Sequence, residues 1–244
     1  MRRASSSTAW PTRSGSSPAH DGKQNGFQKA GQRVPQAGPA IPSTAAQHGR
    51  HDRILAAAIA MLEAGGEDAL QMKELSQRAG VSVATLYRYF PAKDHVLLAI
   101  LHSRYSAALA RVTGQVQRGA TARERVTNHL LREFRAEQRE PRLTAALVRV
   151  ISETSRSYSE VLERTEQLHL QMLAHVAGAG RELSEEQRRL LPVVQAIFGA
   201  ATRRWLAGVA SPAQARFEIR AGCRLLDLAD ETVTEDLALA GSAG

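Results

Sequence analysis

A short segment in the first half of the chain combines hydrogen-bonding side chains with the spacing of a helix. Leu86 and Phe90 lie four residues apart, which predicts that they share a buried helix face. Thr85, Tyr87, Arg88 and Tyr89 then fall at exposed-looking positions and offer hydroxyl and guanidinium groups to solvent. Such a helix suits the patterned base edges of a DNA major groove. The alternative interpretation is a buried aromatic cluster that contacts no partner.

Two predicted helices and the turn between them form a helix-turn-helix pattern. The first helix is predicted at residues 72–79 and the second at residues 83–90. Gly80 suits the tight turn because glycine accepts a positive φ at no steric cost, and Ser82 suits the N-cap of the second helix. In such a unit the second helix lies in the major groove, with its N-terminal residues at the base edges.

Eight residues in and around this motif are the predicted DNA-binding residues. Val83 and Ala84 are small enough for a close approach and can contact a thymine methyl group, while Thr85 can also form a hydrogen bond. Lys93 stands at the start of the next helix, where an ammonium group and free backbone amides suit a phosphate. The full set is Lys73, Ser82, Val83, Ala84, Thr85, Tyr87, Tyr89 and Lys93.

The composition predicts an all-α protein with a sizeable core. The chain has 244 residues, 43% of them apolar, and it lacks the alternating apolar–polar runs of β-strands. Its single cysteine, Cys223, excludes an intrachain disulfide and indicates a reducing compartment. No apolar run approaches the roughly 18 residues of a membrane span. We therefore expect a cytoplasmic protein with no membrane partner.

The formal net charge of +8 arises mostly from the N-terminal tail. Residues 1–48 carry six basic side chains against one acidic side chain, whereas residues 49–95 carry six of each. The tail is rich in Ser, Gly, Pro and Gln, so we expect it to be disordered. It is either a basic arm that adds non-specific DNA affinity or a solvated extension without a role. Residues 230–244 are predicted to form a flexible C-terminal tail.

Helical spacing and capping residues divide the rest of the chain into two domains. Residues 49–95 hold a first helix that ends at a Gly-Gly pair, followed by the helix-turn-helix motif. Residues 96–229 hold about six helices, and the first of these begins just before the boundary. Capping boxes at Thr121 and Ser184 open two of them, and Pro212 suits the first position of the last. The predicted helices lie near 92–117, 122–140, 142–153, 157–177, 185–208 and 212–229.

Residues 50–95 resemble the DNA-binding domain of the TetR (tetracycline-repressor) family. The phrase AGVSVATLYRYFPAKDHVLLAIL carries the resemblance, through its Gly-Val-Ser turn, Thr-Leu-Tyr, Tyr-Phe and the following lysine. The span 50–229 also fits the family layout of three short helices and a domain of about six. The resemblance implies base contacts from Val83, Ala84, Thr85, Tyr87 and Lys73, and phosphate contacts from Ser82, Tyr89 and Lys93. Two positions depart from the family pattern, because Gln71 replaces the usual Thr or Ser cap and Glu67 replaces an aromatic residue.

The family pattern implies a transcriptional repressor that binds a palindromic DNA operator as a homodimer. Twofold dimers bind paired half-sites about one helical turn apart. The last two predicted helices each carry an apolar stripe that suits a four-helix bundle between protomers, unless the stripes pack only within one protomer. The stripes comprise Val193, Val194, Ile197, Ala200 and Ala201 on one helix, and Phe217, Ala221, Leu225 and Leu228 on the other.

A pocket for a small hydrophobic effector is expected in the C-terminal domain. Its predicted wall residues, each of which could instead be ordinary core, are Tyr105, Phe134, Ile151, Met172, Phe198 and Trp205. A finer resemblance, carried by TLYRYFPAKDHVLL and Trp205-Leu206, is to repressors of sterol breakdown in actinobacteria. It implies a steroid or fatty acyl-CoA thioester as the effector. A ligand that favours a tilted helix 92–117 would release DNA by an allosteric population shift.

Two other functions remain open at this point. One is a helical-bundle enzyme with a di-iron site, because Glu166 and His169 form a Glu-x-x-His unit. Such a site needs a second unit and two further inward glutamates, and the sequence lacks the second unit. It also lacks a phosphate-binding glycine loop and a Cys/His zinc pattern, so we expect no enzyme activity, no cofactor and no metal. The other is a transcriptional activator of the same fold, which would bind DNA in the same way.

Overall fold

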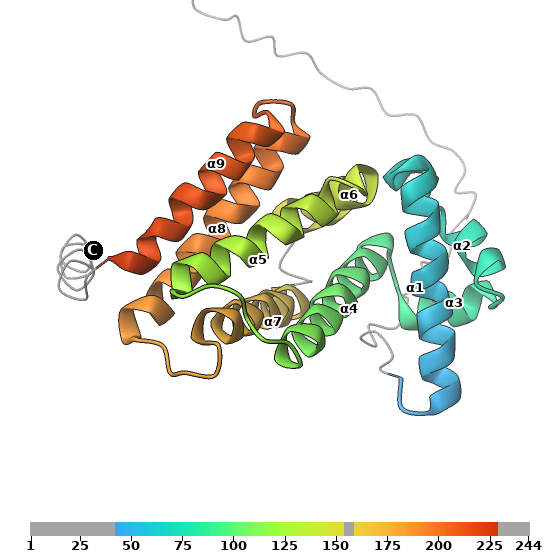
Figure 1. Cartoon of the computed structure of the whole chain (residues 1–244). Helices are drawn as coiled ribbons and strands as arrows, with labels where there is room; N and C mark the ends of the chain where they lie inside the picture. The colour runs from blue at the N-terminus through green and yellow to red at the C-terminus, as the bar shows by residue number, and fades with distance from the viewer. Residues whose placement is uncertain (1–41, 154–158, 229–244) are drawn as a thin grey trace, which may run out of the picture. The chain divides into compact units, whose positions relative to one another are not determined.

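The computed structural model describes residues 42–153 and 159–228 of the chain (Figure 1). Within these ranges all regular secondary structure is helical, which confirms the all-α prediction. Residues 1–41 and 229–244, which hold most of the two predicted tails, lie outside the described residues. The α-helices are α1 (Ala45–Gly65), α2 (Met72–Arg78), α3 (Val83–Tyr89), α4 (Lys93–Thr113), α5 (Ala122–Glu137), α6 (Pro141–Glu153), α7 (Ser159–Gly178), α8 (Glu185–Leu206) and α9 (Pro212–Cys223), with the 3₁₀ helices η1 (Glu67–Ala69) and η3 (Arg224–Asp227).

The first helix begins before the predicted domain boundary at residue 49. The Thr44 hydroxyl accepts a hydrogen bond from the Gln47 backbone N–H, and the Gln47 side chain accepts one from the Thr44 backbone N–H. This capping box satisfies two N–H groups that the first turn of a helix otherwise leaves unpaired. The prediction that the tail extends to residue 48 is therefore wrong for residues 45–48, which belong to α1.

The N-terminal domain consists of α1, α2 and α3 around a shared apolar core. Leu62, Leu75 and Leu86, one from each helix, are fully buried. Gly80 has a φ of 64° in the turn between α2 and α3, a backbone conformation that favours glycine. The Ser82 side chain then caps α3, as expected. The core and the turn together fix the orientation of α3 within the domain.

The C-terminal domain comprises α4 to α9. In it, α4 packs against α6 and α7, and α8 and α9 run side by side (Figure 1). Phe134 of α5 and Leu173 of α7 are fully buried in the core of this domain. The inner face of α6 belongs instead to an apolar cluster shared by α1, α2, α3 and the first half of α4, where Leu147 and Val150 pack. As a result, α6 links the two domains.

Four helices of the C-terminal domain end earlier than predicted, among them α5 at Glu137 rather than 140 and α8 at Leu206 rather than 208. α4 ends at Thr113, directly before Gly114, rather than near residue 117. α9 ends at Cys223, and the chain tightens into η3 instead of continuing as α-helix to residue 229. Short 3₁₀ segments are common at the C-terminal ends of α-helices. These changes leave the predicted site residues on the elements to which the sequence assigned them.

Candidate DNA-binding surface and ligand cavity

One face of α3 presents apolar and polar side chains to solvent. Val83 and Tyr87, four residues apart and therefore on the same face, are 43% and 46% exposed. Ala84 is also exposed. Leu86 is fully buried on the opposite face. A short helix that leaves a valine and a tyrosine in water, although its other side holds it firmly to a core, is suited to contact a partner.

The N-terminal turn of α3 holds its hydroxyl groups in a fixed arrangement. Ser82 Oγ accepts a hydrogen bond from the Thr85 backbone N–H at 3.1 Å and donates one to Thr85 Oγ1 at 2.9 Å. Because Thr85 Oγ1 accepts the Ser82 proton, the Thr85 hydroxyl keeps its own proton for an external acceptor. A phosphate contact by the Ser82 side chain would have to compete with the cap.

Tyr89 does not join this exposed face. Its side chain is 2% exposed, and its hydroxyl is buried without a hydrogen-bond partner among the described residues. The ring lies near His51 and Phe90, with centroids 6.4 and 6.3 Å away, and the Arg88 guanidinium lies over it. Helical periodicity explains this position, since Tyr89 follows the buried Leu86 by three residues. The predicted phosphate contact of Tyr89 does not fit this burial. The side chain packs in the core instead.

The two lysines of the predicted set lie in different environments. Lys73, in the first turn of α2, is exposed. Lys93 is half-buried at the start of α4, and its ammonium group donates a hydrogen bond to the backbone carbonyl of Glu67, 3.1 Å away. An ammonium group has three protons. Lys93 can therefore hold this carbonyl and still donate to a phosphate.

A cavity of about 980 Å³ lies between α4, α6, α7 and α8 in the C-terminal domain. Tyr105, Ile151 and Phe198 line it, as predicted from the sequence. The other predicted wall residues, Phe134, Met172 and Trp205, do not line it. Phe134 packs edge-on against Trp205, with ring centroids 5.3 Å apart, and Met172 is buried in the same core. These residues fill the core of the domain because their helices pack directly there.

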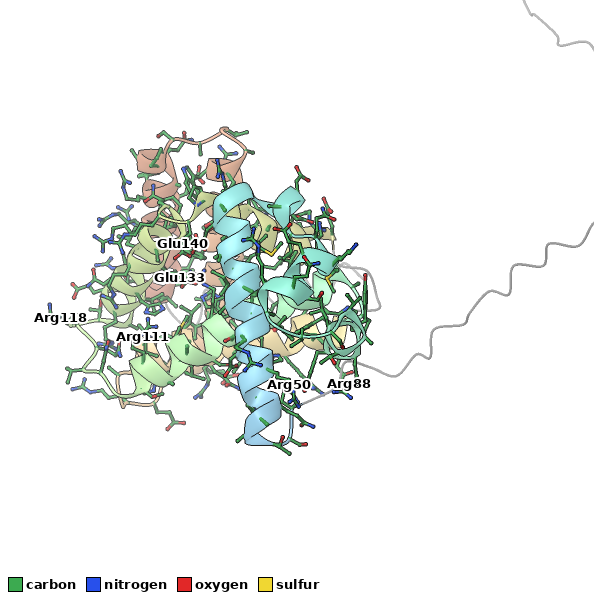
Figure 2. All side chains as sticks on the ribbon, turned by 90° about the vertical axis from the view of Figure 1, so that its right-hand side faces the viewer. Arg50, Arg88, Arg111, Arg118, Glu133 and Glu140 are labelled. Atoms are coloured by element: carbon green, nitrogen blue, oxygen red, sulfur yellow. The ribbon has the colours of Figure 1, made fainter. Side chains whose placement is uncertain are left out.

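Polar groups gather at one side of this cavity. Thr202 Oγ1 donates a hydrogen bond to Glu137 Oε2 at 2.9 Å. Glu133, one helical turn before Glu137 on α5, has its Oε2 atom 3.3 Å from His169 Nε2 and 3.7 Å from His129 Nε2. Glu137, His169 and Thr202 line the cavity. Figure 2 labels Glu133 within the C-terminal domain.

The surroundings drive the pKa values of the two carboxyl groups apart. Burial by itself would raise the pKa of Glu133, but the charge and hydrogen bond of His169 lower it below its ordinary value. Burial and the nearby charge of Glu133 raise the pKa of Glu137 to about 8, although the hydrogen bond from Thr202 opposes this. At neutral pH, Glu133 is therefore ionised and Glu137 carries a proton.

Comparisons with known proteins assign the family. Residues 54–100 match the bacterial regulatory proteins of the tetR family, and residues 119–226 match a tetracyclin repressor-like C-terminal domain. The chain is 33% identical to the HTH-type transcriptional repressor KstR of Mycobacterium tuberculosis over 181 residues, which cover 74% of this chain and 82% of KstR. This protein belongs to the TetR family.

Solved structures of TetR-family proteins share the fold. A TetR transcriptional regulator from Rhodococcus sp. RHA1 superposes with a TM-score of 0.66 at 28% identity, covering 75% of this chain and 97% of that one. Thermus thermophilus FadR, a TetR-family repressor crystallised in complex with lauroyl-CoA, superposes with a TM-score of 0.59 at 19% identity and covers 72% and 92% of the two chains. The family and these relatives are transcriptional regulators rather than enzymes.

The departure of Glu67 from the TetR-family pattern has a structural counterpart. Glu67 Oε2 lies 2.5 Å from Arg149 Nε, and Asp94 Oδ1 lies 2.7 Å from Arg149 Nη2. Glu153, one turn further along α6, is 3.3 Å from the same guanidinium. Burial alone would lower the pKa of Arg149, but its hydrogen bonds to Asp94 and Glu67 raise it. In place of an aromatic contact, this chain has an ion pair between η1 and α6.

The Glu-x-x-His unit does not form a metal site in the part of the chain that the structure describes. Glu166 is exposed, whereas His169 is 1% exposed and stacks on Tyr105 with ring centroids 4.6 Å apart. Among the described residues, no group of His, Cys, Asp or Glu side chains could hold a metal ion. None of the described helices combines the length and apolarity that a bilayer span requires.

Sequence reasoning missed the polar residues that distinguish this cavity and the domain junction. Glu137, Thr202 and Arg149 each depend on a partner far away in the sequence. The four-residue spacing of Glu133 and Glu137 was a usable signal, because like charges at this spacing on one helix face repel each other.

Proposed function

We propose that this TetR-family protein is a ligand-responsive transcriptional repressor that binds a palindromic operator as a homodimer. The observation that carries the proposal is the exposed face of α3, on which Val83 and Tyr87 stand in solvent beside the polar turn at Thr85. Its chemistry matches the major groove, where methyl groups, donors and acceptors alternate along the base edges. The reading helix and the cavity are in one chain, so a small molecule can control DNA binding.

The proposed contacts divide between bases and phosphates. Val83 and Ala84 contact thymine methyl groups, and the free hydroxyl proton of Thr85 is donated to a base acceptor. Tyr87 and Lys73 extend this base-reading surface. The phosphate contacts come from Lys93 and from the capping turn at Ser82, near the N-terminal ends of α4 and α3. Tyr89 contributes by holding α3 in place.

The proposed dimer forms through α8 and α9. Val193 of α8 is 45% exposed, and Phe217 of α9 is 66% exposed. On the same helices Val194 and Ala201 are buried, so one face of the pair packs in the protomer while apolar side chains remain outside. Two copies of this face would form the four-helix bundle expected from the sequence.

The proposed effector is a steroid or fatty acyl-CoA thioester. The cavity of about 980 Å³ is large enough for such an apolar group, and Ile151 and Phe198 give it apolar walls. Arg203, an exposed residue of the same lining, offers a positive charge to the phosphates of CoA. The similarity to KstR and the lauroyl-CoA complex of FadR support this class of effector.

The proposed coupling between cavity and DNA runs through α6 as well as α4. Val148 and Ile151 of α6 line the cavity, while Leu147 and Val150 pack in the apolar cluster that α6 shares with α1–α4. Arg149, between them, binds η1 and the first turn of α4. An effector that displaces α6 therefore shifts the helix-turn-helix motif formed by α2 and α3. A typical coupling free energy of about 1–3 kcal/mol would lower operator affinity roughly 5–150-fold.

The proposal is tested by selecting genomic fragments with the purified full-length protein and footprinting the enriched sites. We expect palindromes with half-sites about one helical turn apart and a mass in light scattering of twice the 26.5 kDa protomer. Steroid and fatty acyl-CoA thioesters are then titrated into the complex. Enrichment without any palindrome would contradict the proposal. Deleting the gene and measuring transcripts of the bound promoters separates repression, in which transcripts rise, from activation, in which they fall.

A further inference from the structure

The polar side of the cavity contains a group whose role the proposed function leaves unassigned. We propose that the Glu137 carboxyl, held by Thr202, is the polar anchor of the cavity and donates a hydrogen bond to an uncharged carbonyl or hydroxyl oxygen of an otherwise apolar effector. This inference rests on the proposed response to an effector. It names the chemical group that the cavity selects and the residue that selects it.

The geometry leaves one oxygen of Glu137 for a ligand. Glu137 is the last residue of α5, and its side chain lines both the main cavity and an adjoining one of about 90 Å³. Thr202, only 2% exposed on α8, donates to Oε2. This is the one hydrogen bond to the Glu137 carboxyl among the described residues. A protonated carboxyl has one donor proton, and with Oε2 accepting from Thr202 the proton is carried by Oε1.

The charged neighbours of Glu137 keep it protonated. Glu133 on the same helix is ionised, because His169 of α7 and His129 stand against it. A second negative charge one turn away, in a partly buried site, is unfavourable, and burial together with Glu133 raises the pKa of Glu137 to about 8. Arg104 of α4 opposes this shift without overcoming it. At neutral pH the cavity therefore offers a hydrogen-bond donor.

This donor discriminates between ligand classes. A ligand carboxylate placed at Glu137 would meet the negative charge of Glu133, whereas an uncharged oxygen would accept the Glu137 proton without that repulsion. The neighbouring surfaces are apolar or flat: Ile151, Phe198 and the ring of Tyr105, which stacks on His169. A rigid, largely apolar molecule with one carbonyl or hydroxyl oxygen matches this arrangement. A site built to hydrogen-bond such an oxygen also rejects the analogue that lacks it.

The test uses a pair of fluorescent probes that differ in one oxygen. The naphthyl ketone prodan emits further to the red when its carbonyl accepts a hydrogen bond, and its 6-propyl analogue lacks that carbonyl. We expect the full-length protein to bind prodan about tenfold more tightly than the analogue at pH 7, the effect of one net hydrogen bond. Glu137→Leu should remove this preference and the red shift. Glu137→Gln should keep both, because its amide also donates, and Glu182→Gln, at an exposed position outside the cavity lining, should change neither.

A pH series identifies the donating form. The prodan preference of the natural protein should fall as the pH rises through about 8, the pKa of Glu137, while that of Glu137→Gln should stay constant. Equal binding of the two probes at pH 7, or no binding of prodan, would overturn the inference. Operator binding of each variant is measured without any probe. If the natural protein binds its operator but shows no preference for prodan, the role of Glu137 is wrong and the proposed function stands. If the natural protein binds no operator, the proposed function is wrong.

Discussion

Replacing Arg149 with methionine should separate effector binding from DNA release. The guanidinium holds Glu67 at 2.5 Å and Asp94 at 2.7 Å, and these three side chains are 29%, 26% and 32% exposed. The contribution of such half-buried ion pairs to the free energy of unfolding lies between two known cases. Surface pairs contribute up to about 1 kcal/mol, and hydrogen bonds to charged groups contribute about 1.5–3 kcal/mol. We assign about 1 kcal/mol to each. Glu153 is 65% exposed and adds little.

Arg149→Met should therefore lower the free energy of unfolding by about 2 kcal/mol. Methionine keeps the apolar stem but removes the link between α6, η1 and α4. In fluorescence anisotropy with labelled operator, affinity without effector should stay within about threefold, since Arg149 is not one of the proposed DNA contacts. The decrease in affinity on adding an acyl-CoA thioester should shrink below about threefold from the 5–150-fold of a typical coupling.

The matched control for this variant is Arg123→Met. Arg123 of α5 pairs with Asp227 of η3, outside the cavity lining, and these side chains are 41% and 43% exposed. Its loss should change stability by less than about 1 kcal/mol, as for exposed pairs, and should leave the effector response intact. If Arg149→Met kept both full stability and the full effector response, the ion pairs at the domain junction would carry no coupling, and the signal would have to pass through α4 and the packed face of α6.

Four further predictions concern the helix-turn-helix motif and the cavity. Thr85→Ala or Tyr87→Ala should cost about 1–3 kcal/mol in operator affinity and relax sequence preference; normal gel shifts would mean that α3 reads with another face. Lys93→Ala should weaken all DNA sequences alike and reduce the salt dependence of binding, as loss of one phosphate contact does; an unchanged salt slope would rule out that contact. Tyr89→Phe should leave operator binding unchanged and not lower the melting temperature, because it removes a buried hydroxyl without a partner. Glu137 binds a proton more tightly in the folded state, with a pKa near 8, than in the unfolded state, so stability should fall as pH rises from about 5 to 8; thermal unfolding of Glu137→Gln should show a smaller fall.

The helix-turn-helix motif could be predicted from the sequence because local chemistry determines it. Gly80 and Ser82 specify the turn and the cap whatever the rest of the chain does, and both stand as expected. The start of α1 was missed although the sequence carries a signal for it. Residues 45–48 share the small and polar composition of the tail, and the capping-box pattern of Thr44 and Gln47 was overlooked there.

The cavity could be predicted only in part, because helical periodicity does not distinguish a wall from a core. Phe134 and Phe198 both fall on inward faces and are both buried, yet only Phe198 meets the cavity. The difference depends on which helices approach closely. Tyr89 is a different case: its spacing of three residues from Leu86 already indicated burial, but its hydroxyl suggested an exposed role.

A single helix explains how a ligand in one domain can act on the other. Successive residues of a helix are rotated by about 100°, so three neighbours on α6 face three different surroundings. Val148 lines the cavity, Arg149 binds the carboxylates at the junction, and Val150 packs in the apolar cluster that α6 shares with α1–α4. Because packed cores deform little, α6 cannot yield to a ligand at Val148 without moving Val150. The ion pair of Glu67 with Arg149 then extends that displacement to η1, whose Glu67 carbonyl holds Lys93 next to the reading helix.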